Sequence, residues 1–598
     1  MLNTVRVLLS LLGLCLPLAQ AKWAAAPAPL VTRWGKAVTP ANVLGEYPRP
    51  QLVRRQWQNL NGLWSYAFAA VDAPRPQRWA GQILVPFPLE SALSGVRRPL
   101  DERERLWYRR SFTVPAGWHG QRLMLNFGAA DWDTVVWVNG HKVGEHTGGY
   151  DAFSFDVTDA LSGTGPQELV VSVWDPGDSG GQPRGKQVRE PHDIWYTSSS
   201  GLWQTVWLEP VPVAHIASLH MTPDIDRGRL VLRVDAPPGD RIHAVALAGS
   251  VVVAEASGPA GAPLTLQLKA PKLWSPSQPY LYRLTVELQH QGRATDRVSS
   301  YFGMRKISVG PDAQGRPRLL LNNRPLFQLG VLDQGFWPDG LYTAPSDAAL
   351  RSDLETLKRL GFNTVRKHVK VEPERWYYWA DKLGLLVWQD MPSGDETAEQ
   401  GGPDISRLDG SATQFQRELT RLVTLHQNHP SIVMWVLFNE GWGQFDTARL
   451  TTLLVRLDPT RLVDSASGWN DREVGNVLDW HRYPGPEAPP ATSGRAAVLG
   501  EFGGLGLPLP GHTWQAQANW GYRTYSDRAA LTGAYTGLIT RLEPLVRQGL
   551  SAAIYTQTTD VEIEVNGLLT YDRALLKMNE RQVRAAHDRL FKVASQVR

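Results

Sequence analysis

The sequence predicts two β-sandwich domains followed by a C-terminal (β/α)8 TIM barrel. The chain has 598 residues, which is too long for one hydrophobic core and corresponds to about three or four domains. Up to about residue 309, short β-rich segments are separated by turn residues. After that position, apolar strands alternate with amphipathic helices, which is the pattern of an α/β domain built on a parallel sheet.

The composition is that of an ordinary globular protein. Hydrophobic residues make up 42% and charged residues 20% of the chain, far from a disordered composition. The net charge of +4 is spread over 62 basic and 58 acidic residues, so neither a nucleic acid nor a membrane surface is expected as a partner. The 24 tryptophans offer flat faces that pack on sugar rings, although large sandwich proteins also bury many of them.

The N-terminus has the features of a secretory signal peptide. Arg6 precedes the apolar stretch 7–18, and Ala19-Gln20-Ala21 supplies an Ala-x-Ala cleavage site. The apolar stretch is too short to span a bilayer as a mature helix. We therefore expect residues 1–21 to be removed on export, which gives a periplasmic or secreted protein without membrane insertion. The only cysteine, Cys15, lies in this segment, so the mature chain would contain no disulfide or thiolate ligand.

The two predicted sandwich domains occupy residues 30–212 and 213–309. In the first, the β-rich run 135–138 precedes Asn139-Gly140, which favours a hairpin turn because both residues tolerate positive φ. The pattern of short strands indicates a jelly roll. In the second, β-rich runs such as 229–234 recur at a spacing typical of an immunoglobulin-like sandwich.

Residues 310–598 are expected to form the barrel. The predicted strands are 326–331, 362–367, 385–389, 432–438, 462–466, 477–480, 497–500 and 552–555. Helical periodicity appears between them, as in 346–360, whose leucines share one face before Gly361. A doubly wound open sheet is the alternative, but no Gly-x-Gly-x-x-Gly turn follows the first strand.

Polar residues gather where the predicted barrel strands end, which is where such barrels build their active sites. They are Asp333, Arg366, Asp390, Asn439, Glu440, His481, Tyr483, Glu501, Gln557 and Asp560. Glu440 and Glu501 each directly follow an apolar run, at the ends of the fourth and seventh strands. The sequence thus places two carboxylates on rigid strand ends at the rim of one pocket.

Two carboxylates that face each other across a glycosidic bond can share its hydrolysis. One protonates the leaving oxygen, and the other attacks the anomeric carbon or activates water. A salt bridge with Arg366 would explain either carboxylate alone, but their joint occurrence favours catalysis on a carbohydrate substrate. This chemistry needs no cofactor, and no ligand cluster in the sequence is specific enough to assign a metal.

Two segments resemble the catalytic motifs of glycoside hydrolase family 2. The segment from His429 to Glu440 is similar to the acid/base signature of that family, and 499–503 is similar to its nucleophile strand. The segments 303–306 and 360–366 are similar to its link into the barrel and its second strand. That family places a jelly roll and an immunoglobulin-like domain before its barrel, so the resemblance covers nearly the whole mature chain.

The resemblance implies a role for each of these residues. Glu440 would be the general acid and then the base, and Glu501 the nucleophile of a mechanism with net retention. Asn439 would bond the 2-hydroxyl of the sugar, Arg366 would keep Glu501 ionised and Tyr483 would orient it. The remaining candidates for substrate binding are Asp333, His481 and Asp560, as binders of neutral hydroxyls, and Tyr555.

Departures from the family pattern bear on the sugar. Lys367-His368-Val369-Lys370 stands where many members carry Ser-His-Tyr-Pro, so His368 is equally well explained as an ordinary rim histidine. The eighth strand lacks the tryptophan that often floors the sugar site, which leaves Tyr555, Trp442 and Trp480 as candidates. The segment 562–567 has two acids and no lysine, whereas glucuronidases of the family hold the carboxylate there with an Asn-x-Lys pair, so β-glucuronides are disfavoured.

The sequence therefore predicts a retaining exo-β-glycosidase for a neutral sugar, most simply a β-galactosidase. The same mechanism with another sugar stays open: β-mannosidase, exo-glucosaminidase, β-glucuronidase or furanosidase. A carbohydrate-binding protein with an inactive barrel is the third reading, against which the retention of both carboxylates argues. The two sandwich domains are expected to brace the barrel and to lend a loop to its pocket. The aromatic segments 132–137 and 203–207 would alternatively allow them to bind polysaccharide, although core packing explains alternating tryptophans better.

Overall fold

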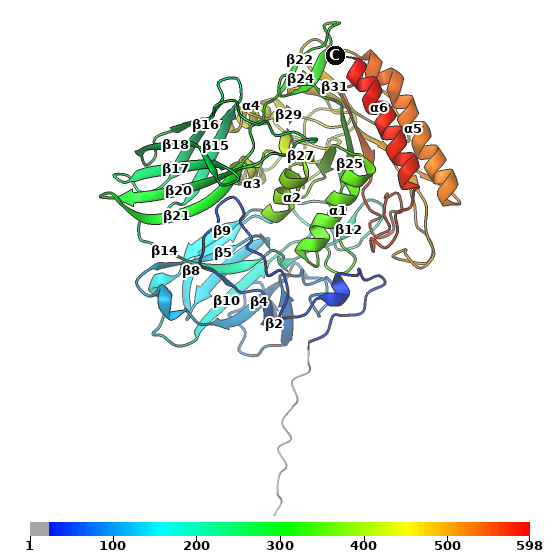
Figure 1. Cartoon of the computed structure of the whole chain (residues 1–598). Coiled ribbons are helices and arrows are strands. Elements are labelled where there is room, and N and C mark those ends of the chain that lie inside the picture. The colour runs from blue at the N-terminus through cyan, green and yellow to red at the C-terminus, as the bar shows by residue number, and fades with distance from the viewer. Residues whose placement is uncertain (1–22, 598) are drawn as a thin grey trace, which may run out of the picture.

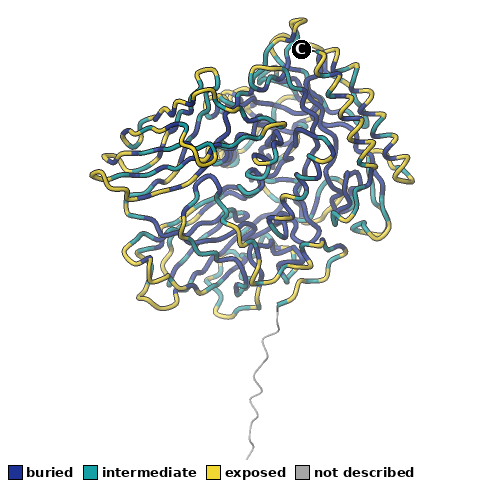
Figure 2. Tube along the Cα trace, in the orientation of Figure 1, coloured by how far each residue is buried: buried dark blue, intermediate teal, exposed yellow. Residues whose placement is uncertain are grey.

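The computed structural model describes residues 23–597 (Figure 1). The expected signal peptide and Cys15 lie outside the described residues. Within the described range, no helix combines the length and apolar character needed to cross a bilayer. Buried residues run through the centre of all three domains, and exposed residues are concentrated on the outer loops (Figure 2).

The N-terminal domain is a sandwich of two antiparallel sheets. One sheet contains, in spatial order, β3 (Gly81–Val85), β2 (Gly62–Ala70), β4 (Glu104–Phe112), β10 (Gln167–Trp174), β7 (Asp133–Val138) and β8 (His141–Thr147). The other contains β1 (Gln58–Asn59), β14 (Val206–Val211), β5 (Arg122–Phe127) and β9 (Phe153–Asp156). Alternating apolar residues of both sheets, such as Trp64 and Leu125, form one core. Asn139, at φ 50°, turns β7 into β8 as the sequence predicts.

The second domain is a smaller sandwich with its own core. Its sheets are β15 (Ser218–Asp224), β16 (Arg229–Asp235) and β19 (Leu264–Gln267), and β18 (Val251–Pro259), β17 (Arg241–Ala248), β20 (Tyr282–His290) and β21 (Arg293–Phe302). Arg305 follows β21 and is buried, and it donates hydrogen bonds to the carbonyls of Pro430, Ile432 and Thr460. This one side chain ties the second domain to the start of a barrel strand.

The C-terminal domain is a nearly closed barrel of eight parallel strands. Their order is β29 (Leu462–Asp464), β28 (Ile432–Val436), β27 (Leu386–Asp390), β26 (Thr364–Lys367), β25 (Gln328–Asp333), β34 (Ala552–Thr556), β31 (Ala496–Gly503) and β30 (Val477–Arg482). The predicted fold class is confirmed. The small antiparallel sheet of β22 (Ile307–Pro311), β23 (Pro317–Leu321) and β24 (Arg324–Pro325) packs against the apolar cluster inside the barrel.

Among the described residues, six α-helices surround the barrel. They are α1 (Asp347–Leu360), α2 (Glu374–Leu383), α3 (Asp409–His426), α4 (Thr447–Leu457), α5 (Arg528–Gln548) and α6 (Glu580–Gln596). The first begins where the Ser346 side chain accepts the N–H of Ala349, and it ends at Gly361, whose φ is 95°. In the described chain no α-helix follows β29 or β30, so loops alone connect β29 to β30 and β30 to β31. The long helices α5 and α6 lie side by side on the outside (Figure 1).

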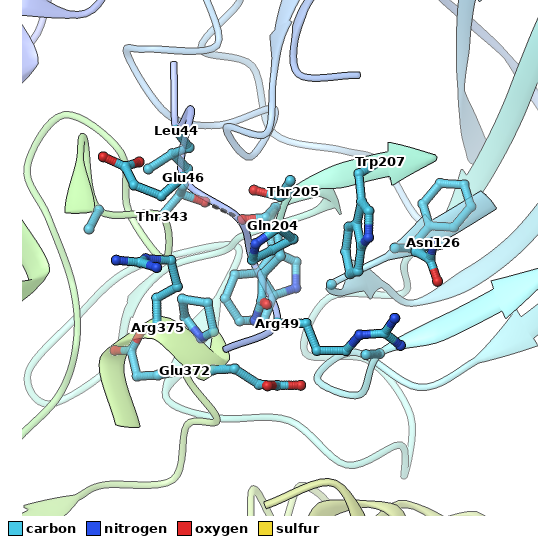
Figure 3. Close-up of a pocket in the computed structure, with 18 of the residues that line it drawn as sticks. Leu44, Glu46, Arg49, Asn126, Gln204, Thr205, Trp207, Thr343, Glu372 and Arg375 are labelled. Atoms are coloured by element: carbon cyan, nitrogen blue, oxygen red, sulfur yellow. Dashed lines mark hydrogen bonds between the residues drawn. The ribbon is translucent and has the colours of Figure 1, made fainter. Parts of the chain in front are cut away.

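The jelly roll meets the barrel along a seam that contains a cavity (Figure 3). Trp207 and Arg49 line it from the jelly-roll side, and Glu372 and Arg375 line it from the barrel side. The guanidinium groups are paired within the protein, Arg49 with Glu209 at 2.7 Å and Arg375 with Asp347. Neither Glu440 nor Glu501 lines this cavity, which is therefore separate from the site described next.

Candidate active site

The carboxylates of Glu440 and Glu501 lie close together at the C-terminal mouth of the barrel. Glu501 is part of β31, and Glu440 lies in the segment after β28. Glu440 has a φ of 53°, in the left-handed region that a non-glycine residue seldom adopts, and its N–H bonds the Ser467 carbonyl at 2.8 Å. One oxygen of each carboxylate and a ring nitrogen of His481 all lie within 4.8 Å of one another.

Glu501 accepts a hydrogen bond on each carboxylate oxygen. The Tyr483 hydroxyl donates to Oε2 at 2.5 Å, and Nη1 of Arg366 donates to Oε1 at 3.3 Å. Burial alone would raise the pKa of this carboxyl, but the positive charges of His481 and Arg366 lower it to about 2. Glu501 is therefore a buried and ionised carboxylate, and the ionised state is the one that a nucleophile requires.

Arg366 is fully buried on β26 and organises the base of the site. Its Nε and Nη2 atoms each lie 3.0 Å from an oxygen of Asp390, in a bidentate pair. Nη2 also donates to Oδ1 of Asn439 at 2.8 Å. This bond fixes the orientation of the Asn439 amide and leaves its NH2 group as the part that can bind a substrate.

His481 connects the acid/base candidate to the barrel interior. Its Nδ1 atom lies 2.7 Å from Oε1 of Glu440, and its Nε2 atom lies 2.8 Å from Oγ of Ser467. The Ser467 hydroxyl donates to Asp479 at 2.6 Å, so it accepts the Nε2 proton of His481. Burial alone would lower the pKa of the imidazole, but the carboxylates of Glu501 and Glu440 raise it. Both ring nitrogens of His481 are thus engaged within the protein, one by Glu440 and the other by Ser467.

Asp333 and Asp560, expected to bind sugar hydroxyls, are engaged inside the protein. Asp333 accepts the Lys367 ammonium at 2.7 Å. Asp560 accepts the Lys577 ammonium at 2.6 Å and the N–H of Gly567 at 2.8 Å. All four charged side chains are almost completely buried. The charge of each carboxylate is therefore compensated by a lysine, and binding of sugar hydroxyls by Asp333 and Asp560 stays a prediction.

Tyr555 does not form the floor of the site. Successive side chains of a strand point to opposite faces, and in β34 Ile554 belongs to the cluster inside the barrel, whereas Tyr555 belongs to the cluster under the helices. Its ring packs edge-on against Tyr535 of α5, with centroids 4.8 Å apart. Trp480 likewise packs against the cluster on the helix side. Trp442, the third candidate for the floor of the sugar site, is buried, and its ring packs edge-on against Trp195 with centroids 4.9 Å apart.

A jelly-roll segment, residues 182–197, forms one wall of the barrel mouth. The Thr197 N–H donates to Glu562 at 2.9 Å, and the Tyr196 hydroxyl donates to Glu564. At Gly185 the backbone presses on the barrel, since a Cβ atom there would lie 2.4 Å from the Val369 carbonyl oxygen. The two acids after β34 thus bind the jelly roll, and burial raises the pKa of Glu562 to about 7.

Lys186 lies in this wall and is half-buried. Its positive charge lowers the pKa of Glu501 and counteracts the burial that raises the pKa of Glu564. The ammonium group therefore acts on the mouth of the barrel. No sequence pattern singles out this lysine, because it lies in a turn-rich loop of another domain.

Three further side chains at the mouth have no periodic signal in the sequence. His368 donates Nδ1–H to Asp390 at 2.8 Å, and burial followed by the charge of Lys186 holds its pKa well below the usual value. Its neutral Nε2 atom is then an acceptor. Tyr522 stacks on Tyr483, with ring centroids 3.8 Å apart and planes inclined by 3°. Trp469 lies beside His481. Tyr522 and Trp469 come from loops, whose contacts only the folded chain reveals.

Models of one family match most of the chain. Residues 57–212 match the sugar binding domain of glycosyl hydrolases family 2, residues 214–305 match the model described as glycosyl hydrolases family 2, and residues 316–483 match its TIM barrel domain. A β-glucuronidase from Paenibacillus borealis is 28% identical over 454 residues, which cover 69% of this chain and 73% of that protein. A β-galactosidase from Enterobacter cloacae is 27% identical over 505 residues, 75% of this chain but only 47% of that longer protein.

Solved structures share the fold over almost the whole chain. The β-D-glucuronidase of Dictyoglomus thermophilum superposes with a TM-score of 0.70 at 18% identity, covering 91% of this chain and 98% of that one. The β-galacturonidase of Eisenbergiella tayi bound to galacturonate gives 0.69 at 20% identity, covering 92% and 99%. At such identities the likeness shows the fold. With the family models matched across all three domains, the chain belongs to glycoside hydrolase family 2, a family of enzymes that hydrolyse glycosides.

Proposed function

We propose that this protein is a retaining exo-β-glycosidase that acts by double displacement. The observation that carries the proposal is the separation of Glu440 and Glu501, whose nearest carboxylate oxygens lie within 4.8 Å. Retaining enzymes hold the two carboxyl groups about 5–5.5 Å apart, whereas inverting enzymes need about 6.5–9.5 Å to admit a water molecule. An approach of one oxygen from each carboxylate to within 4.8 Å fits the retaining arrangement, in which a carboxylate attacks directly.

In the first step, an oxygen of Glu501 attacks the anomeric carbon and the bond from that carbon to the glycosidic oxygen breaks. The protonated carboxyl of Glu440 gives its proton to the departing oxygen, so the aglycone leaves as a neutral alcohol. In the second step, the Glu440 carboxylate takes a proton from water while that water attacks the anomeric carbon and releases Glu501. Two inversions give net retention.

The surrounding side chains support each carboxylate in its task. Arg366 and Tyr483 donate to Glu501, which keeps it ionised and fixes the oxygen that attacks. His481 contacts Glu440 at 2.7 Å and can hold the proton that Glu440 gains and loses. The NH2 group of Asn439, oriented by Arg366, is the donor for the 2-hydroxyl of the sugar, whose bond strengthens in the transition state.

A β-galactoside remains the first candidate substrate, and a β-uronide is the second. The sequence argument against an anionic sugar rests on the missing Asn-x-Lys pair and on the repulsion expected from Glu562 and Glu564. These two acids accept hydrogen bonds from Thr197 and Tyr196, which weakens the second part of that argument. Lys186 brings a positive charge to the same mouth. Relatives named β-glucuronidase and β-galacturonidase agree with the second candidate, and relatives named β-galactosidase agree with the first.

A panel of 4-nitrophenyl glycosides, α and β, tests the proposal with the Glu501→Ala variant as control. We expect hydrolysis of one or more β-glycosides, retention at the anomeric carbon in the proton NMR spectrum of the first product formed, and no turnover by the variant. Initial formation of the inverted anomer would contradict the double displacement. Equal activity of the variant would exclude Glu501 as the nucleophile.

We also propose that the protein is exported and cleaved after Ala21. The support is the arrangement of Arg6, the apolar stretch 7–18 and Ala19-Gln20-Ala21. N-terminal sequencing of the protein recovered from periplasm and medium should give Lys22 as the first residue. Recovery of an intact N-terminus from the cytoplasm alone would argue against export.

A further inference from the structure

Trp469 is exposed, unlike every other tryptophan of the chain. All 24 tryptophans lie within the described residues, and 23 are buried or half-buried, whereas Trp469 is 37% exposed. Leaving an indole partly in water forfeits apolar burial that the other tryptophans gain. An exposed indole at a rim therefore needs an explanation other than packing.

The chain on both sides of Trp469 is fixed in place. Ser467 and Asn470 are each 1% exposed. The Ser467 hydroxyl bonds Asp479 at 2.6 Å, and Oδ1 of Asn470 accepts the N–H of Gly401 at 2.7 Å. The indole is thus held out from the loop between β29 and β30 by anchored neighbours, so little backbone ordering remains to be lost when a ligand contacts it.

Trp469 also lies directly beside the acid/base candidate. Gly468 has a φ of 108°, and a Cβ atom there would lie 3.2 Å from Cγ of Glu440 and 3.4 Å from Nδ1 of His481. The indole meets the His481 ring edge-on, with centroids 6.0 Å apart. His481 in turn contacts Glu440 at 2.7 Å. The indole is therefore next to the group that protonates the leaving oxygen.

We propose that Trp469 is the platform of an aglycone subsite, which binds the second sugar ring of a β-linked oligosaccharide by its flat C–H face. The inference rests on the proposed function, in which Glu440 protonates the glycosidic oxygen and the aglycone must lie on its side of the cleaved bond. A flat apolar ring is suited to the C–H face of a pyranose, and the indole N–H can bond one hydroxyl. A planar aromatic aglycone presents the same flat face and binds the same platform.

The alternative is that Trp469 only covers His481. In that case its removal would change the pH dependence of catalysis and would slow every substrate alike. A platform, in contrast, contributes only where the substrate has a ring on the aglycone side. The two roles are separated by comparing glycosides that share the cleaved sugar and differ in the leaving group.

The experiment compares a disaccharide with a methyl glycoside, for example lactose and methyl β-D-galactopyranoside. For an enzyme that accepts only uronides, the pair is the 4-nitrophenyl and methyl β-D-glucuronides. We expect Trp469→Ala to lower kcat/KM about tenfold for the substrate with the ring aglycone, with less than a twofold change for the methyl glycoside and an unchanged pH profile. Trp469→Phe should retain part of the preference, because a flat ring remains.

Partition of the glycosyl-enzyme provides a second measurement. Glucose added as acceptor should capture the intermediate less often in Trp469→Ala than in the wild type, whereas methanol should capture it equally in both. Trp79→Ala is the matched control, because that half-buried indole lies in the jelly roll against Arg109. It should change neither the fraction of intermediate captured by glucose nor the fraction captured by methanol. The platform would be overturned if Trp469→Ala lost kcat/KM equally on both glycosides, or if the ratio of capture by glucose to capture by water were the same in variant and wild type. In either case, hydrolysis by the wild type would still support the proposed function. A Glu501→Ala variant that turns over substrate as fast as the wild type would instead refute the proposed function.

Discussion

The Nδ1 atom of His481 lies 2.7 Å from Oε1 of Glu440, while the opposite ring nitrogen, Nε2, is 2.8 Å from the Ser467 hydroxyl. Since that hydroxyl donates to Asp479, Nε2 of His481 carries a proton in either charge state. Nδ1 then accepts from a protonated Glu440 or donates to an ionised one. The pair can hold the same proton on either partner, as a residue that alternates between acid and base requires.

Glu501→Ala should remove catalysis without unfolding the protein. Loss of the nucleophile leaves no group to form the glycosyl-enzyme, so we expect kcat to fall by about 10⁴-fold or more. Azide should partly restore turnover of 4-nitrophenyl substrates by occupying the space of the lost carboxylate, and the glycosyl azide should have the α configuration. An unchanged circular dichroism spectrum is the control. A β-configured azide product would contradict the assignment.

Glu440→Ala should act selectively on poor leaving groups. A nitrophenolate departs without a proton, whereas an alkoxide needs one, so we expect kcat/KM to fall about 10²- to 10⁴-fold for alkyl glycosides or disaccharides. The loss for dinitrophenyl glycosides should be much smaller. A plot of log kcat/KM against the pKa of the leaving group measures this directly. Equal slopes for wild type and variant would show that Glu440 is not the acid.

The ionisation of Glu501 should also appear in the pH dependence of stability. Its pKa is lowered from 4.5 to about 2, because nearby cations outweigh its burial. A carboxylate with a depressed folded pKa stabilises the fold above its unfolded pKa, and this contribution is lost as the pH falls through the folded pKa. The stabilisation corresponds to about 3 kcal/mol.

The difference in Tm between wild type and Glu501→Gln, measured as a function of pH, tests whether the pKa of Glu501 is lowered in the folded protein. It should not shrink from pH 8 to about 5, where Glu501 stays ionised, and it should shrink between about pH 4 and 2. Glu287→Gln, in a strand of the second sandwich domain, serves as the control for general acid effects. A difference that already shrinks between pH 7 and 5 would mean that the pKa of Glu501 is raised rather than lowered.

The barrel and its two strand-end carboxylates were accessible from the sequence because both depend on local patterns. Apolar runs such as 432–438 mark buried parallel strands, and the residue that follows each run lies at the mouth. Arg366, Asn439, Glu440 and Glu501 come together at the mouth for this reason.

The remaining features of the site could not be predicted from the sequence. They depend on which face of a strand a side chain points to and on contacts between domains. The position of Tyr555 near a strand end predicts that it lies at the mouth, but the alternation of side chains along the strand turns its ring toward α5. No sequence pattern pairs Asp333 with a cation, but in the fold Nζ of Lys367 lies 2.7 Å from its Oδ2 atom. Lys186 and Trp469 lie in loops without periodicity, so their approach to the carboxylates follows only from the packing of segments distant in the sequence.

Lys186→Met should separate the two candidate sugars. The ammonium group comes from the jelly roll, and its charge lowers the pKa of Glu501 in the barrel. A charge-assisted hydrogen bond to a sugar carboxylate would be lost in the variant, whereas a neutral sugar has no charge to be recognised.

For an enzyme that accepts uronides, we expect kcat/KM on 4-nitrophenyl β-D-glucuronide to fall about 10- to 100-fold, with a loss of less than fivefold on the β-D-galactoside. Lys142→Met, which removes an exposed lysine of β8 that pairs with Glu145 at 2.6 Å, should leave both rates unchanged. Equal losses on both sugars would assign Lys186 to the tuning of Glu501 alone, and recognition of the sugar carboxylate would then belong to another residue.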